Sequence, residues 1–128
     1  MPLVRIAVRA GTPPATQHAI ADAVHHALAE TIGIPANDRF QLISEYGSEQ
    51  FSYDPSYLNI SRTDQLVMLQ ITISFGRTVE QKRALYRRIA ELLAEHAGIR
   101  PEDVFINLIE VAKENWSFGL GVAQYAPE

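Results

Sequence analysis

The sequence repeats itself, and this repeat is the feature that most constrains the fold. Sliding the 128-residue chain by 65 residues aligns two halves, about 2–46 and 67–111, without a gap. Gly33 then meets Gly98, and Phe40 meets Phe105, so the expected helix ends and strand entries coincide. Similarity at a fixed spacing indicates a repeated structural unit. We therefore expect a single domain over residues 1–128 that contains two copies of one unit.

Each half has the pattern of strand, helix and strand. Residues 3–9 alternate apolar and polar positions, and apolar residues dominate 66–73 and 104–111, with a further strand expected at 39–46. Between these strands, apolar residues recur at helical spacing, once after Thr12 as a candidate cap and once after a Thr78-x-x-Gln81 capping box. The fold class predicted is α/β, with a duplicated β-α-β unit that forms a four-stranded sheet with two helices on one face.

Two further regions carry structural expectations. Residues 47–64 are rich in Ser, Tyr, Asp, Gly and Pro, which predicts a long loop with short strand pieces around Phe51 and Leu58. The third and fourth strands carry apolar residues on both faces: Leu69 and Ile71 lie on the face opposite Met68, and Phe105 and Ile109 on the face opposite Ile106. Because an uncovered apolar sheet tends to associate, we expect copies of the chain to pack together in a closed ring.

Composition excludes several classes of function. The chain has no cysteine, which rules out disulfides, thiolate metal sites and cysteine nucleophiles. Its net charge of −4 argues against a nucleic-acid partner, because a phosphate-binding surface normally needs a basic stripe. No apolar run approaches the ~20 residues of a membrane span, and no leader pattern precedes Leu3. We expect a cytoplasmic protein with no membrane partner.

The candidate catalytic group is Pro2. If Met1 is removed, Pro2 becomes a secondary amine at the head of a strand, where its ring nitrogen is held in place. An α-amino group has an ordinary pKa of about 7.7–8.0, and apolar surroundings or a nearby guanidinium lower the pKa of such an amine. The residue could therefore act as an acid or a base near neutral pH.

These features together resemble the tautomerase superfamily, in which an amino-terminal proline is the catalytic group. The resemblance spans the whole chain and is sharper to the malonate semialdehyde decarboxylases. It rests on the segments 33–41, 60–63, 80–82 and 115–121, the last reading Asn-Trp-Ser-Phe-Gly-Leu-Gly, and on 123–125. It implies a homotrimer with sites near subunit boundaries, and no metal or organic cofactor.

The resemblance also implies a set of site residues. Pro2 would be the acid or base, Asp38 a polar partner that orients substrate or water, and Arg77 the group that binds a substrate carboxylate. A guanidinium suits that role because it forms a bidentate, charge-assisted pair with a carboxylate. The remaining substrate-binding candidates are an aromatic wall of Trp116, Phe118 and Tyr125, together with Arg62 and Phe75.

Phe75 is a departure from the decarboxylases, which carry a second arginine two residues before the position of Arg77. The preferred function is therefore keto-enol tautomerisation of a small oxo or enol carboxylic acid. A malonate semialdehyde-type decarboxylase, a hydratase or a dehalogenase is the alternative within the superfamily. A catalytically silent trimer that serves as a binding or assembly protein is the alternative from another class.

Other polar residues have simpler interpretations. His18, Asp22 and His26 share one helical face, which could hold a metal but is ten times as often a solvated surface. His96 lies on the apolar stripe of the second helix and is expected in the core or an interface. Glu45 and Glu110 are related by the repeat, so a structural role at strand ends is favoured over a paired-carboxylate mechanism. Arg5 and Arg39 are possible additional anion contacts.

Overall fold

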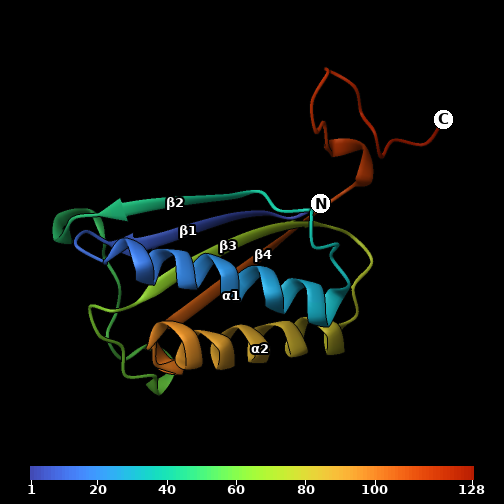
Figure 1. The fold of residues 1–128 in the computed structure, drawn as a ribbon. Helices are drawn as coiled ribbons and strands as arrows, with labels where there is room; N and C mark the ends of the chain where they lie inside the picture. Colours follow the sequence, from blue (N-terminus) through green and yellow to red (C-terminus); the bar gives the residue numbers. More distant parts are fainter.

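The computed structural model describes all residues, 1–128, and confirms the duplicated β-α-β architecture (Figure 1). The sheet has the strand order β2-β1-β3-β4. Strands β1 and β2 are parallel, as are β3 and β4, whereas β1 and β3 run antiparallel and join the two halves. The elements are β1 (Leu3–Arg9), α1 (Pro14–Ile32), β2 (Gln41–Tyr46), β3 (Val67–Ser74), α2 (Val79–Ala97) and β4 (Val104–Val111).

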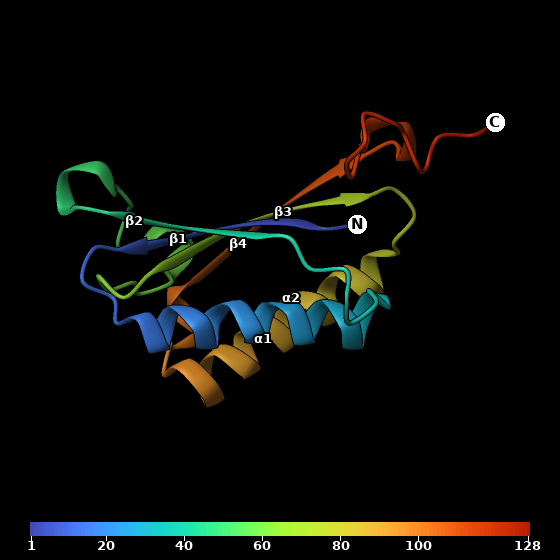
Figure 2. The ribbon, with the colours of Figure 1, turned by 45° about the horizontal axis from the view of Figure 1, so that its top comes forward.

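Both helices cover the same face of the sheet, and the other face is bare (Figure 2). The alternation of the strands decides which residues are buried: Val4, Ile6 and Val8 face the helices and are almost fully buried. A core of 20 buried residues joins both halves. Full burial of each large apolar side chain there contributes about 1.5–3 kcal/mol. Neither helix is long and apolar enough to cross a membrane.

The helix ends follow the sequence signals with one exception. Thr78 and Gln81 form the complete capping box at the start of α2. Gly33 and Gly98 end the two helices with φ of 72° and 67°, a left-handed conformation in which a side chain would be strained. The expected cap of α1 was wrong: the Thr12 hydroxyl donates to the Arg9 carbonyl at 2.7 Å, and α1 begins on prolines without a side-chain cap.

The short strands expected between β2 and β3 were also wrong. The segment forms two single-turn 3-10 helices, Ser48–Gln50 and Tyr57–Asn59, because its hydrogen bonds are satisfied locally. Asp54 accepts the backbone N–H of Ser56 at 2.9 Å, and this hydrogen bond lowers the pKa of the Asp54 carboxyl. The Arg62 guanidinium donates to three carbonyls of the same loop, the shortest at 3.0 Å from Tyr57. Leu58 adopts a φ of 60°, which no strand allows.

The alternative candidates separate in space. Glu45 and Glu110 lie on the opposite edge strands, where Glu45 accepts the Gly11 N–H and Glu110 pairs with Lys82, so the two carboxylates are not paired within one chain. Asp22 accepts a hydrogen bond from Arg39 at 2.6 Å on the exposed face of α1. His96 has a side chain that is 54% exposed, so its expected place in the core was wrong, and an interface role stays a prediction.

Candidate active site

A pocket of about 440 Å³ lies at the end of the sheet where the chain begins. Pro2 is buried at its base, immediately before β1. The segment after β4, which projects beyond the sheet in Figure 1, supplies Trp116 and Phe118 as its wall. The complete lining is Pro2, Leu3, Phe40, Thr72, Val111, Asn115, Trp116, Ser117 and Phe118. The pocket thus joins residues from both halves of the repeat.

The three predicted aromatic residues lie together. The rings of Trp116 and Phe118 stack at 5.4 Å with an interplanar angle of 7°, and Tyr125 meets Phe118 edge-on at 4.9 Å. Phe40, from the connection before β2, also packs near Phe118, with 6.2 Å between the two ring centres. Such stacked and edge-to-face pairs stabilise an arrangement by about 0.5–1.5 kcal/mol each beyond their burial. The wall is therefore held in place by its own packing.

Asp38 lies beside the start of the chain, as the predicted site requires. Its carboxylate accepts a hydrogen bond from the Met1 amine and forms an ion pair with it. Asp103, its counterpart in the second half, instead accepts the backbone N–H and hydroxyl of Thr63 at 2.7 and 2.6 Å. In each half this aspartate holds the segment that precedes a central strand. Only in the first half does that segment carry an amine.

The environment of Asp103 shows what the repeated aspartate contributes to the fold. Burial by itself would raise the pKa of Asp103, but the two hydrogen bonds from Thr63 and the nearby Arg100 guanidinium outweigh it. The pKa therefore lies below its usual value, and the carboxylate is stabilised in its charged form.

Ser74, the last residue of β3, connects the two predicted groups Arg77 and Trp116. Its side chain is fully buried, and its hydroxyl accepts the indole N–H of Trp116 at 3.0 Å. Its carbonyl accepts a hydrogen bond from the Arg77 guanidinium at 3.3 Å. Arg77 is half-buried next to the aromatic wall, although it does not line the 440 Å³ pocket itself.

Two predicted residues stand apart from the pocket. Phe75 is 61% exposed, and its backbone N–H donates to the carbonyl of Val111, a lining residue, at 3.0 Å. Arg62 is engaged with the carbonyls of the loop between β2 and β3 and lines a different hollow, with Tyr53 and Phe105 among others. Within one chain, the structure does not bring Arg62 to Pro2.

The structure also reveals site residues that the sequence reasoning missed. Phe40 could have been found from the repeat, in which it aligns with a second aromatic residue, Phe105. In the structure both side chains are exposed. Lys113 shares a hollow of about 260 Å³ with Met1 and Tyr125, so it is a second cation near the amino terminus. Ser74 carried no signal, because a single serine at a strand end is unremarkable in a sequence.

This arrangement is suited to proton transfer on a small acid. In a chain without Met1, the buried ring nitrogen of Pro2 is an amine that can exchange protons, and the nearby cations Arg77 and Lys113 can bind a substrate carboxylate.

Comparison with known proteins supports this interpretation. Two family models described as tautomerase enzyme match residues 38–119 and 2–58. The probable tautomerase YusQ of Bacillus subtilis is 43% identical over 97% of this chain and 98% of its own length. The structure of FG41 malonate semialdehyde decarboxylase, inhibited by 3-bromopropiolate, is 38% identical with a TM-score of 0.91, covering 96% of this chain and 93% of that one.

A more distant structure shares the fold alone. A fused 4-OT, solved as a symmetric trimer, is 22% identical with a TM-score of 0.79, covering 98% of this chain and 99% of that one.

Proposed function

This chain belongs to the tautomerase family of enzymes, and from that premise we propose that Pro2, once it is the first residue, is the catalytic acid or base. The observation that carries the proposal is the position of Pro2. It is buried at the base of the aromatic pocket, directly next to the amine that pairs with Asp38. The substrate class is a small oxo or enol carboxylic acid.

In the proposed tautomerisation, neutral Pro2 takes the proton from the enol oxygen as the carbonyl forms. The protonated ring nitrogen then returns a proton to the neighbouring carbon, so the substrate is isomerised and the proline is regenerated. Arg77 binds the substrate carboxylate. Lys113 serves as the second cation, in place of the arginine that Phe75 replaces. Removal of Met1 opens the hollow that Lys113 and Tyr125 line, so the Lys113 amine can then reach the substrate. The reaction uses only groups of the protein.

Decarboxylation of a 3-oxo acid is the second candidate, and two observations favour it. The likeness to FG41 malonate semialdehyde decarboxylase is high. Asp38 also pairs with the amine at the start of the chain, directly next to Pro2, so a protonated Pro2 would have a carboxylate partner there. Protonated Pro2 would then donate a hydrogen bond to the 3-oxo group while the carbon–carbon bond breaks and carbon dioxide leaves. The exposed Phe75, in place of an arginine, favours tautomerisation instead.

We propose a homotrimer assembled through the bare face of the sheet. Leu42, Phe105 and Ile109 on this face are 52%, 49% and 37% exposed, and apolar residues that gather on one face favour association. The symmetric trimer of fused 4-OT, which shares the fold, provides a precedent for the assembly. Light scattering should give three times the 14.3 kDa of one chain. A cytoplasmic location stays a prediction from the sequence.

The central experiment is a panel of enol-pyruvates and 3-oxo acids assayed with the wild type, Pro2→Ala and Arg77→Gln. The intact mass of each protein must first show that Met1 is absent. We expect Pro2→Ala to abolish turnover and Arg77→Gln to raise KM more than it lowers kcat. Equal turnover by the wild type and Pro2→Ala on every active substrate would remove proline catalysis, whereas no turnover of any substrate by the wild type would favour a binding or assembly role.

The pH dependence of kcat/KM separates the two reactions. If Pro2 acts as a base, the rate falls below the pKa of its amine, whereas an acid loses rate above that pKa. Detection of carbon dioxide or of a hydrated product identifies decarboxylase or hydratase activity directly.

A further inference from the structure

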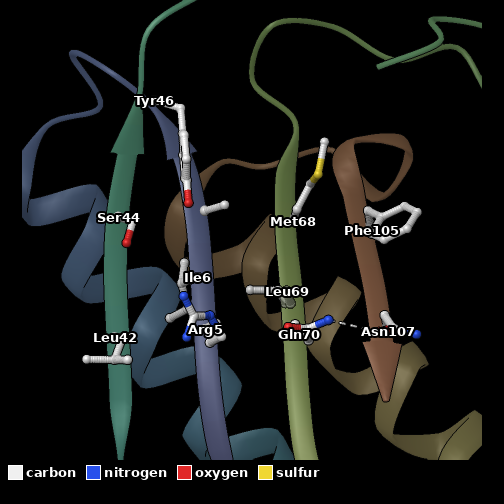
Figure 3. Close-up of a pocket in the computed structure, with 11 residues that line it drawn as sticks. Arg5, Ile6, Leu42, Ser44, Tyr46, Met68, Leu69, Gln70, Phe105 and Asn107 are labelled. Atoms are coloured by element: carbon white, nitrogen blue, oxygen red, sulfur yellow. Dashed lines mark hydrogen bonds between the residues drawn. The ribbon is translucent and has the colours of Figure 1, made fainter. Parts of the chain in front are cut away.

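The bare face of the sheet carries a polar row within its apolar surface. In the strand register, Arg5 is opposite Leu42 on one side and Gln70 on the other, and Gln70 is opposite Asn107. The Gln70 amide donates to the Asn107 side-chain oxygen at 3.3 Å (Figure 3). The polar row thus crosses β1, β3 and β4, and the apolar Leu42 continues it on β2.

A hollow of about 340 Å³ opens next to this row. It lies where Ala7 is opposite Ser44 and Met68, because an alanine side chain leaves the space between its larger neighbours unfilled. Figure 3 shows Tyr46 reaching from the end of β2 toward Arg5, with Ser44 beside it on the same strand. The volume is at the lower end of the range for small-molecule sites.

The charge of Arg5 has no partner within the chain. Arg5 is exposed and forms neither a hydrogen bond nor an ion pair, and no aspartate or glutamate lines the hollow. Arg9, four residues later on the same face of β1, pairs with Asp64 at 3.1 Å and lies 5.7 Å from the centre of the Phe51 ring. Arg5 is thus a free guanidinium at the edge of a hollow whose other lining residues are uncharged and mostly apolar.

We propose that this hollow is a second binding site, for a small oxyanion such as a short carboxylate. The Arg5 guanidinium pairs with the anion in bidentate fashion, and the hydroxyls of Ser44 and Tyr46 donate further hydrogen bonds. Leu42 and Phe105 contact the apolar part of the ligand. The site shares no lining residue with the pocket at Pro2.

The proposed trimer strengthens this inference, and this step rests on that assembly. Copies that pack through the bare face would enclose Arg5 together with the hollow, and within one chain no aspartate or glutamate lines that hollow. An unpaired buried charge is strongly destabilising, whereas a bound anion satisfies it. The anion should therefore stabilise the oligomer as well as the chain.

The test measures anion binding without turnover, so it does not depend on proline catalysis. Arg77→Gln serves as the background, because it removes carboxylate binding at the catalytic pocket. Calorimetry and thermal unfolding are followed with butyrate, inorganic phosphate and chloride at constant ionic strength. We expect saturable binding and a raised Tm in this background, and at least a tenfold weaker Kd when Arg5→Gln is added. Stronger binding of butyrate than of phosphate identifies an organic ligand, and the reverse an inorganic one.

Two further variants test the site independently of the loss of charge. Arg87→Gln removes an exposed arginine on α2 and should bind as the background does. Ala7→Leu keeps Arg5 but fills the hollow, so it should abolish binding. Unchanged binding by Arg5→Gln or Ala7→Leu overturns the proposal, as does a response that follows ionic strength alone. An oligomer that depends on Arg5 but not on any anion also overturns it, because Arg5 would then pair with a carboxylate of the neighbouring copy.

Discussion

The hydrogen bond between Ser74 and Trp116 offers a quantitative test of how the aromatic wall is held. Ser74→Ala removes only the hydroxyl, which is fully buried and accepts the indole N–H at 3.0 Å. A neutral hydrogen bond contributes about 0.5–1.5 kcal/mol, and an indole N–H left without a buried partner costs about 1–3 kcal/mol. Because Trp116 is half-buried and water can reach part of the ring, we expect a loss of about 1 kcal/mol.

A double-mutant cycle isolates this interaction. Trp116→Phe removes the donor, so Ser74→Ala should cost almost nothing in that background, which gives a coupling energy of about 1 kcal/mol. Urea unfolding at one fixed protein concentration measures each corner of the cycle, since an oligomer's stability depends on concentration. Ser52→Ala, which removes an exposed hydroxyl, is the matched control. Effects of Ser74→Ala and Trp116→Phe that add within about 0.3–0.5 kcal/mol would refute the reasoning.

The same variant reports on the site. Trp116 is the only tryptophan in the chain, so its emission should shift in Ser74→Ala and remain unchanged in Ser52→Ala. If Trp116 forms the wall of the active site, kcat/KM should also fall in Ser74→Ala and not in the control.

Three further predictions address stability and the site. Asp103→Asn should lower the free energy of unfolding by about 2 kcal/mol near neutral pH. The pKa of Asp103 is lowered in the folded state, so this difference in stability is fully present above the ordinary carboxyl pKa of about 4. It disappears as the pH falls through the folded-state pKa. Urea unfolding across that pH range will check this. Gly98→Ala should cost about 1 kcal/mol through its φ of 67° alone, since nothing lies within 4 Å of the added methyl, and an unchanged Tm would contradict this. Asp38→Asn should lower kcat/KM by removing the carboxylate that pairs with the amine at the start of the chain, and an unchanged kcat/KM would exclude Asp38 from the site.

The local elements of this protein were determined by the sequence alone. Periodicity and end signals such as the Thr78 capping box and Gly98 act within a few residues, so they can be recognised without the fold. The repeat extended this prediction to the topology, because two similar β-α-β units have few ways to form one sheet. The expected strands near Phe51 and Leu58 failed, because the sequence did not show that the loop satisfies its own hydrogen bonds.

The site required the tertiary structure. Motif resemblance named Pro2, Asp38 and Trp116, but only the fold shows that the amino terminus, the entry to β2 and the segment after β4 meet at one end of the sheet. The roles of Ser74 and Arg5 were likewise recognised only in the structure. Ser74 matters because its hydroxyl accepts the indole N–H of Trp116, and Arg5 matters because it borders an unfilled hollow. Such contacts join residues far apart in the chain, so no local pattern in the sequence records them.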